Sequence, residues 1–217
     1  MSATKSAHIP RATIQRLAIY LEVLEKLHHD GITVISSEPL AKACGVNASQ
    51  IRKDLTYFGE FGVRGVGYNI ANLMASIAEA LGANRPWNCV VVGTGKLGRA
   101  LLNHRDFSLR SYHIIGAFDS DPEKVGETIS GITIQNVSCL KECTEALGAR
   151  IGIITTPPAW AQLVADQLVE AGIQGILNFV PARIFVPDTV FLEYVDFFHH
   201  LYALSFNIAT AEQQQNR

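Results

Sequence analysis

The stretch CVVVGTGKLGRALL, residues 89–102, decides the fold of most of this chain. It joins an apolar run of strand length to a glycine turn and then to a helical pattern. In such a unit the first glycine permits a tight turn, the second lets a pyrophosphate approach the backbone, and the third lets helix and strand pack closely, while the helix N-terminus supplies amides and partial positive charge. The stretch predicts a dinucleotide-binding (Rossmann) domain. The predicted cofactor contacts in it are Gly93, Thr94, Gly95, Lys96, Leu97 and Gly98.

A carboxylate stands where such a domain binds ribose. The next apolar run, residues 112–118, predicts a second strand, and it ends in Asp119, twenty-one residues beyond Gly98. A carboxylate there accepts hydrogen bonds from the adenosine ribose hydroxyls. Asp121 adds a second negative charge, and no Arg or Lys precedes Lys124, so a 2′-phosphate would meet repulsion. The pattern favours NAD(H) over NADP(H).

Two further strands are predicted at residues 150–154 and 175–179, separated by a helix at about 158–171. Strands that alternate with helices at this spacing form a parallel, doubly wound sheet. Ligands bind at the carboxyl edge of such a sheet. The predicted contacts after the earlier of these two strands are Thr155, Thr156 and Pro157. They suit cofactor contact and helix capping equally well.

Residues 1–82 are mostly helical in pattern. A first helix is predicted between residues 10 and 31, and its inward stripe is Ile14, Leu17, Leu21 and Leu24. A second helix starts at Ser37 and stops at residue 45. Asn47 then caps a third helix, with Gln50 reaching back to it.

The second and third helices form the pattern of a helix-turn-helix, because the turn between them is tight and contains glycine. Ile51 and Leu55 point inward, which leaves cations and amides for the major groove. The predicted DNA contacts are Ser49, Gln50, Arg52, Lys53, Thr56 and Tyr57. On spacing alone, an ordinary three-helix bundle with a polar face is an equal alternative.

The stretch FGEFGVRGVGY, residues 58–68, follows the third helix and holds four glycines and three aromatics around one arginine. Such glycine density predicts a tight β-ribbon, which beside a recognition helix would be a wing. Arg64 at its tip is predicted to contact phosphate or a minor groove. The alternative is a structural hairpin with a solvated arginine. A further helix with apolar residues from Ile70 to Leu81 closes this domain.

Three segments follow from these patterns: a DNA-binding domain at residues 1–84, a cofactor domain at 85–195 and a C-terminal helix with its tail at 196–217. The last helix begins at Asp196 and Phe197 and is too apolar around its circumference to be solvated alone. A second copy that exchanges this helix would cover it, because DNA half-sites call for a two-fold dimer. Packing back on its own domain is the alternative.

Composition excludes several classes of protein. The net charge is −2, so nucleic acid is not held merely by a basic surface, and 48% hydrophobic residues suffice for a packed core. No apolar run is long enough to cross a bilayer, and no secretory signal is present. Four cysteines without Cys-x-x-Cys or zinc-like spacing predict no metal and no disulfide framework. We expect a cytoplasmic protein with no membrane partner.

These stretches resemble a known family. RKDLTYFG (52–59) running into FGVRGVGY (61–68) looks like the signature of the Rex family of bacterial redox-sensing transcriptional repressors. The likeness continues over nearly the whole chain. Its further segments are VGTGKLG (92–98), FDSDPEKVG (118–126), GILNF (175–179) and DF (196–197).

The resemblance implies a homodimer with winged-helix heads, Rossmann domains that sense NADH against NAD+, and an exchanged C-terminal helix. Its double-stranded operator would be an inverted repeat near fermentative or respiratory genes. It assigns Arg52, Lys53 and Arg64 to DNA, the three glycines and Asp119 to the cofactor, and Asp196 and Phe197 to the dimer switch. His104 stands where members of the family carry a tyrosine, so no switching role is assigned there.

The predicted function is repression of transcription that NADH relieves by changing the dimer. No substrate domain and no catalytic acid or base are found, so no catalytic residue is assigned. The alternatives are a small NAD-dependent oxidoreductase and a scaffold that holds another nucleotide such as coenzyme A.

Overall fold

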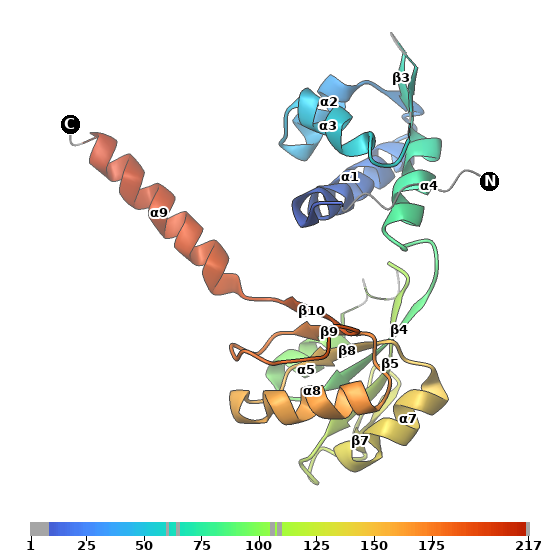
Figure 1. Cartoon of the computed structure of the whole chain (residues 1–217), viewed down its shortest axis with the longest axis vertical. Helices are drawn as coiled ribbons and strands as arrows, with labels where there is room; N and C mark the ends of the chain where they lie inside the picture. The colour runs from blue at the N-terminus through green and yellow to red at the C-terminus, as the bar shows by residue number, and fades with distance from the viewer. Residues whose placement is uncertain (1–8, 60, 64–65, 105–106, 108–109, 216–217) are drawn as a thin grey trace. The chain divides into compact units, whose positions relative to one another are not determined.

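The computed structural model describes residues 9–59, 61–63, 66–104, 107 and 110–215 of the 217-residue chain. The chain divides into two compact units, Met1–Arg85 and Pro86–Arg217 (Figure 1). The predicted fold class, a winged helix followed by a Rossmann domain, is confirmed. Within the described part of the chain, no helix has the length and apolar character needed to cross a membrane.

The first unit packs its helices against a small antiparallel sheet of order β1-β3-β2. The helices are α1 (Arg11–His29), α2 (Ser37–Cys44), α3 (Ala48–Leu55) and α4 (Ile70–Ala80). The strands are β1 (Val34–Ile35), β2 (Gly62–Val63) and β3 (Gly67–Asn69). The predicted ribbon is thus formed by β2 and β3, whereas β1 was not predicted, because two residues are too short to show an alternating pattern.

The buried face of α1 differs from the predicted stripe. Leu17 and Leu24 are buried as expected, but Ile14 is 45% exposed, and Tyr20 and Thr13 are buried instead. The helix is therefore turned so that two polar side chains face α3. A buried partner for those hydroxyls explains the turn, since polar groups enter a core only with hydrogen bonds.

Only one of the two hydrogen bonds predicted between Asn47 and Gln50 at the start of α3 is present. Asn47 Oδ1 accepts a 2.8 Å hydrogen bond from the amide of Gln50. The prediction that the side chain of Gln50 reaches back to Asn47 is wrong, because Gln50 Nε2 instead donates to Asp54 Oδ1 at 2.8 Å. The carboxylate of Asp54 is a strong, charged acceptor for the side-chain amide of Gln50, whereas the start of the helix would offer only a backbone N–H to its carbonyl oxygen.

The second unit is a seven-stranded sheet of order β10-β9-β8-β4-β5-β7-β6, parallel except for the β6–β7 pair. Its strands are β4 (Trp87–Val92), β5 (Tyr112–Asp119), β6 (Thr128–Ile129), β7 (Ile132–Asn136), β8 (Ile151–Ile154), β9 (Gly175–Asn178) and β10 (Phe191–Tyr194). Its helices include α5 (Lys96–Leu102), α7 (Leu140–Leu147) and α8 (Ala161–Glu170). The 3-10 turns η1 (Val137–Cys139) and η2 (Pro158–Trp160) precede α7 and α8.

The central strand is apolar on both sides because helices cover both of its faces. Val90 and Val92 belong to the core shared with α7 and α8, whereas Cys89 and Val91 belong to the core on the α5 side. All four are at most 1% exposed. Burial on both faces explains why residues 89–92 form a continuous apolar run rather than an alternating one.

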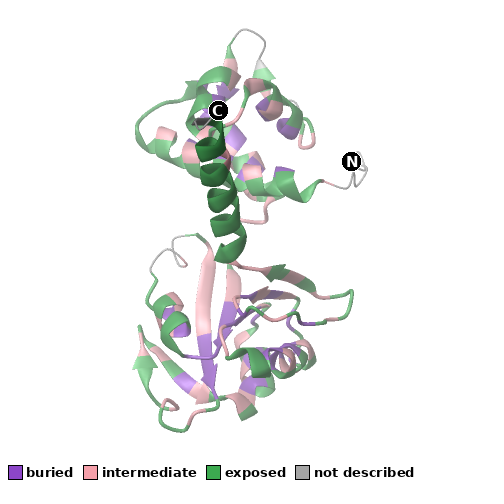
Figure 2. Cartoon of the chain, turned by 90° about the vertical axis from the view of Figure 1, so that its left-hand side faces the viewer, coloured by how far each residue is buried: buried purple, intermediate pink, exposed green. Residues whose placement is uncertain are grey.

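The last helix, α9 (Phe197–Gln215), is coloured as exposed over almost all of its described length in Figure 2. Several of its exposed residues have large apolar side chains. Phe206 and Tyr202 are each 69% exposed. The other exposed apolar residues of this helix are Phe197, Phe198, Leu201, Leu204 and Ile208.

Candidate DNA-reading helix and nucleotide cavity

The outward face of α3 carries most of the residues predicted to contact DNA. Ser49, Arg52, Lys53 and Thr56 are exposed, and Tyr57 is half-buried. Gln50 is turned toward Asp54 and is therefore less available to DNA than the sequence suggested. Arg64 lies outside the described residues. Two adjacent cations on one exposed helix suit phosphate and base-edge contacts.

A buried carboxylate fixes α3 against α1. Asp54 is 1% exposed, and its two oxygens accept hydrogen bonds from Arg16 Nε at 2.7 Å and from a terminal Arg16 nitrogen at 2.7 Å. The hydroxyls of Tyr20 and Thr13 donate to the same carboxylate at 2.8 and 3.2 Å. With the bond from Gln50, these contacts set the rotation of α3 and hence which side chains face outward.

The charge of Asp54 is favoured despite its burial. Burial by itself raises the pKa of Asp54, but hydrogen bonds from Arg16, Tyr20 and Gln50 outweigh it and hold the pKa below its usual value. The same network raises the pKa of Tyr20, through burial first and then its bond to Asp54. This network was not predictable from the sequence, because Asp54 lies more than thirty residues along the chain from Arg16 and Tyr20.

The ribbon of β2 and β3 packs closely on β1. Gly67 has φ +109°, and a Cβ atom there would lie 2.5 Å from the carbonyl oxygen of Ile35. This glycine is required both by its conformation and by the approach of the neighbouring strand. The ribbon thus extends from a fixed base beside α3.

A cavity of about 450 Å³ lies at the carboxyl ends of β4, β5 and β8 in the second unit. Predicted residues that line it are Gly93, Gly95, Asp119, Thr155, Thr156 and Pro157. Thr94, Lys96, Leu97 and Gly98 do not line it. The cavity is also lined by Asp121, whose charge was expected beside Asp119, and by residues that were not predicted to line it: Val92, Ser120, Lys124, Val137, Trp160, Leu163, Val164 and Gln167. Several of them come from η2 and α8, whose amphipathic pattern indicates only a helix.

The three glycines of the turn differ in what surrounds them. A Cβ atom at Gly93, where φ is +97°, would lie 2.8 Å from the backbone of Thr155 and Thr156, and one at Gly98 would lie 2.0 Å from the carbonyl oxygen of Gly93. At Gly95, no atom lies within 4 Å of such a position. The first and third glycines therefore allow close packing, while the second leaves open space above the backbone.

The carboxylate of Asp119 is hydrogen-bonded to the glycine turn. Its Oδ2 accepts hydrogen bonds from the amide and the hydroxyl of Thr94, each at 2.7 Å, and its Oδ1 accepts from the amide of Asp121 at 3.0 Å. Burial raises the pKa of Asp119, but these donors and Lys124 outweigh burial and lower it. The carboxylate is therefore ionised and lies at the cavity wall.

A cation stands among these carboxylates. Lys124 Nζ lies 3.4 Å from Asp119 Oδ2 and 3.2 Å from Asp121 Oδ2. The predicted repulsion of a 2′-phosphate depended on the absence of any Arg or Lys before Lys124, but Lys124 itself reaches both carboxylates. The turn of residues 121–125 brings the amine back to the strand end, so repulsion of a 2′-phosphate is weaker than two bare carboxylates would produce.

The two threonines after β8 have different roles. Thr155 Oγ1 donates to the carbonyl oxygen of Gly93 at 2.6 Å and so joins β8 to the glycine turn. Thr156 Oγ1 is buried and has no hydrogen-bond partner in the described structure. An unpaired buried hydroxyl beside a cavity is a group that a bound ligand can satisfy.

Asp196 caps α9. Its Oδ1 accepts from the amide of Phe198 at 2.9 Å, and its Oδ2 lies 3.6 Å from His199 Nε2. Phe197 follows it and is 56% exposed. This carboxylate partner of His199 was not apparent from the sequence.

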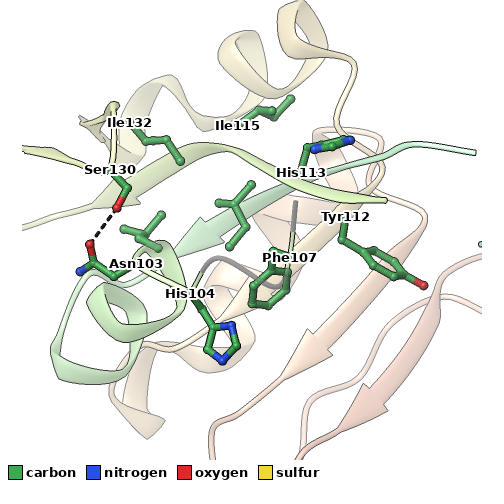
Figure 3. Close-up of a pocket in the computed structure, with 10 residues that line it drawn as sticks. Asn103, His104, Phe107, Tyr112, His113, Ile115, Ser130 and Ile132 are labelled. Atoms are coloured by element: carbon green, nitrogen blue, oxygen red, sulfur yellow. Dashed lines mark hydrogen bonds between the residues drawn. The ribbon is translucent and has the colours of Figure 1, made fainter. Parts of the chain in front are cut away.

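A second cavity, of about 530 Å³, lies at the amino end of β5 (Figure 3). His104 lines it, and its ring meets Phe107 edge to face at 6.1 Å. Asn103 accepts a 2.7 Å bond from Ser130 at the same cavity. The cavity is at the opposite end of β5 from Asp119.

Comparison with known families matches both halves of the chain. Residues 8–56 match the family described as putative DNA-binding protein N-terminus, and residues 84–182 match the CoA binding domain family. The chain is 57% identical over 208 residues to the redox-sensing transcriptional repressor Rex of Maridesulfovibrio salexigens, covering 96% of this chain and all of that one. It is 54% identical over 213 residues to the Rex of Solidesulfovibrio magneticus, covering 98% and 96%.

Solved structures agree with this likeness. A crystal structure of RSP with β-NAD+ and operator DNA has a TM-score of 0.90 and 35% identity, with 97% of each chain covered. A structure of RSP with β-NADH has a TM-score of 0.88 and 34% identity, covering 97% of this chain and 99% of that one. RSP is described as a Rex-family repressor.

Proposed function

Since the chain belongs to the Rex family of redox-sensing transcriptional repressors, we propose that it represses transcription by binding operator DNA and releases that DNA when NADH occupies the cavity of its second unit. The single observation that carries the proposal is the cavity around Gly95 in the second unit of a chain whose first unit carries an exposed cationic helix. The protein acts as a regulator rather than as an enzyme, in the cytoplasm where its operator is.

The cavity fits a dinucleotide in three respects. Gly95 leaves open space where a pyrophosphate would pass. Asp119 is ionised and uses carboxylate lone pairs that can also accept from ribose hydroxyls. Thr156 offers a buried hydroxyl without a partner. We assign pyrophosphate contact to Gly93 and Gly95, with Thr94, Lys96, Leu97 and Gly98 shaping the turn, and further contacts to Thr155, Thr156 and Pro157.

The DNA contacts proposed for the first unit are those on the outer face of α3 and on the wing. Lys53 and Arg52 neutralise phosphates or reach base edges, and Ser49, Thr56 and Tyr57 add polar contacts. Gln50 holds Asp54 and contributes by positioning α3. Arg64 remains assigned to the wing from the sequence.

A second copy of the chain is proposed to cover α9. On the α5 side of the sheet, Ile151, Leu177 and Phe179 are only partly buried, and Phe191 of β10 is 78% exposed. The apolar residues of α9 offer a matching surface. Exchange of α9 between two copies would bury both surfaces and place two α3 helices on one inverted repeat.

The redox response follows from charge and burial. The nicotinamide ring carries a positive charge when oxidised and none when reduced, so apolar surroundings favour the reduced form. Apolar side chains of α9 and of the cavity rim, such as Trp160 and Leu163, supply such surroundings. Asp196 caps α9 beside Phe197, and a change in dimer packing would act through this helix start.

The test selects a bound duplex from a random library of inverted repeats and follows its release by fluorescence anisotropy. NADH should release the DNA, whereas NAD+ at equal concentration should not. Energy transfer from Trp160 to NADH reports binding directly, and Trp160→Phe should reduce that signal. A complex retained at saturating NADH would contradict the proposal.

Matched variants separate the two halves of the test. Lys53→Ala should weaken DNA binding and flatten its salt dependence, because one phosphate contact is lost, while energy transfer from Trp160 to NADH is unchanged. Coenzyme A is the control ligand: release of DNA by coenzyme A and not by NADH would favour the scaffold alternative.

A further inference from the structure

Two cysteines lie together at the start of α7, beside the nucleotide cavity. Cys139 ends η1 and immediately precedes α7, and Cys143 lies four residues later, so the two side chains are on the same side of the helix. Cys139 Sγ is 3.3 Å and Cys143 Sγ is 2.7 Å from the same atom, Oε1 of Gln135. The two thiols therefore share one acceptor.

A bond between the two sulfur atoms needs a small movement of the backbone at this site. Cα atoms four residues apart in an α-helix are about 6 Å apart, within the span of up to about 6.8 Å that disulfides bridge. Their Cβ atoms are about 5–6 Å apart, whereas a disulfide needs about 3.5–4.5 Å, so the first turn of α7 has to tighten. Cys139 is the N-cap residue, with φ −96° and ψ 9°, so its side chain can adjust without breaking the hydrogen bonds inside α7. Both thiols are half-buried and free.

We propose that Cys139 and Cys143 form a reversible disulfide on exposure to hydrogen peroxide, and that this bond alters the wall of the nucleotide cavity. Ionised Cys139 attacks the peroxide, which breaks the O–O bond and leaves a sulfenic acid and hydroxide. Cys143 then attacks the sulfenic sulfur, and its proton leaves with the departing hydroxyl as water. The two thiols lose two electrons and two protons, and the peroxide becomes two water molecules.

The order of the two steps follows from the environments of the thiols. Burial, then the hydrogen bond with Cys139, raises the pKa of Cys143 to about 11. Cys143 therefore keeps its proton at neutral pH, and peroxide reacts with thiolates rather than thiols. Cys143 is therefore assigned the second attack, and closure of the disulfide, which needs its thiolate, becomes faster as the pH rises.

The bond would reach the cavity through the end of β7. The thiols donate to Gln135, and Cys139 Sγ is also 3.1 Å from the carbonyl oxygen of Asn136; a disulfide has no S–H to donate. Asn136 lies opposite Asp119 in the strand register, and Val137 lines the cavity. Oxidation thus removes contacts that hold the cavity wall next to Asp119, which should weaken NADH binding.

Peptide mapping tests the disulfide without any cofactor. Lys141 lies between the two cysteines, so trypsin separates residues 125–141 from residues 142–150 unless a disulfide joins them. Peroxide-treated full-length protein should yield the joined peptides, and a reductant should separate them. Cys139→Ser and Cys143→Ser should yield separate peptides, whereas Cys44→Ser, a matched change in the first unit, should still yield joined ones. Separate peptides from the oxidised wild type, or joining found only in covalent dimers on a non-reducing gel, would overturn the proposal.

The effect on the cavity rests on the proposed function and has its own readout. Titration with NADH, followed by energy transfer from Trp160, should show a higher Kd for the oxidised wild type than for the reduced protein, and no such change for Cys143→Ser. Equal Kd values in protein whose peptides are joined would refute the link to the cavity. If reduced protein binds no NADH at all, the proposed function fails instead, and the peptide map is unaffected.

Discussion

The two units each centre on a buried carboxylate, but the carboxylates are satisfied in different ways. Asp54 in the first unit is 1% exposed and is paired with the guanidinium of Arg16. Asp119 in the second unit is 8% exposed, accepts mainly from amide and hydroxyl groups, and lies on the wall of a cavity. A carboxylate paired on all sides positions a helix, whereas one at a cavity wall can also meet a ligand.

The largest effect is expected at Asp54. Asp54→Ala leaves Arg16 without its partner and Tyr20 without its acceptor, so unfolding of the first unit should become easier by about 3 kcal/mol. Arg16 is one-quarter exposed, which keeps the cost at the lower end of the range for buried pairs. Urea denaturation measures it, with Asp30→Ala on the exposed end of α1 as control. Equal loss in both variants would show that the network does not support α3.

The second-largest expected effect is a difference between substitutions at Gly98 and at Gly95 in the glycine turn. Gly98→Ala places a methyl group against the carbonyl of Gly93 and should lower the stability of the second unit by about 1–3 kcal/mol. The methyl group added by Gly95→Ala meets no protein atom, so the melting temperature of this variant should stay near that of the wild type. Its affinity for NADH should fall about tenfold, which corresponds to about 1.4 kcal/mol of binding free energy. Melting curves and NADH titration measure the two effects. Normal NADH affinity in Gly95→Ala would mean that the pyrophosphate does not pass there.

The smallest expected effect is the pH dependence of the stabilisation that Asp54 provides. The folded-state pKa of Asp54 is lowered, so its stabilisation is complete above the usual Asp pKa of about 4 and is lost as the pH falls through the lowered folded-state pKa. The difference in unfolding free energy between wild type and Asp54→Asn should therefore be largest near about pH 7 and should begin to shrink as the pH falls below about 4. Denaturation at about pH 7 and at pH values below about 4 measures it. A difference that does not change with pH would show that the charge of Asp54 contributes nothing.

Much of the molecule was predictable because its signals are local. The glycine turn, the strand ending at Asp119 and the cap at Asn47 depend on neighbours within a few residues, where propensity and periodicity apply. The helices α2 and α4 likewise begin and end close to where their caps and glycines predict. The two-residue strand β1 and the edge strands β6 and β10 were missed because they exist only by pairing.

Tertiary structure alone decided how distant residues meet. The rotation of α1 that buries Tyr20 rather than Ile14, the return of Lys124 to Asp119 and the meeting of two thiols at Gln135 involve partners whose pairing leaves no repeating pattern in the sequence. By itself the sequence determined the two units, the turn that carries the open glycine and the cations of α3, because backbone conformation and hydrophobic period are read locally. The buried contacts required the folded chain, since a polar side chain is placed by whichever donor or acceptor the packing brings within reach.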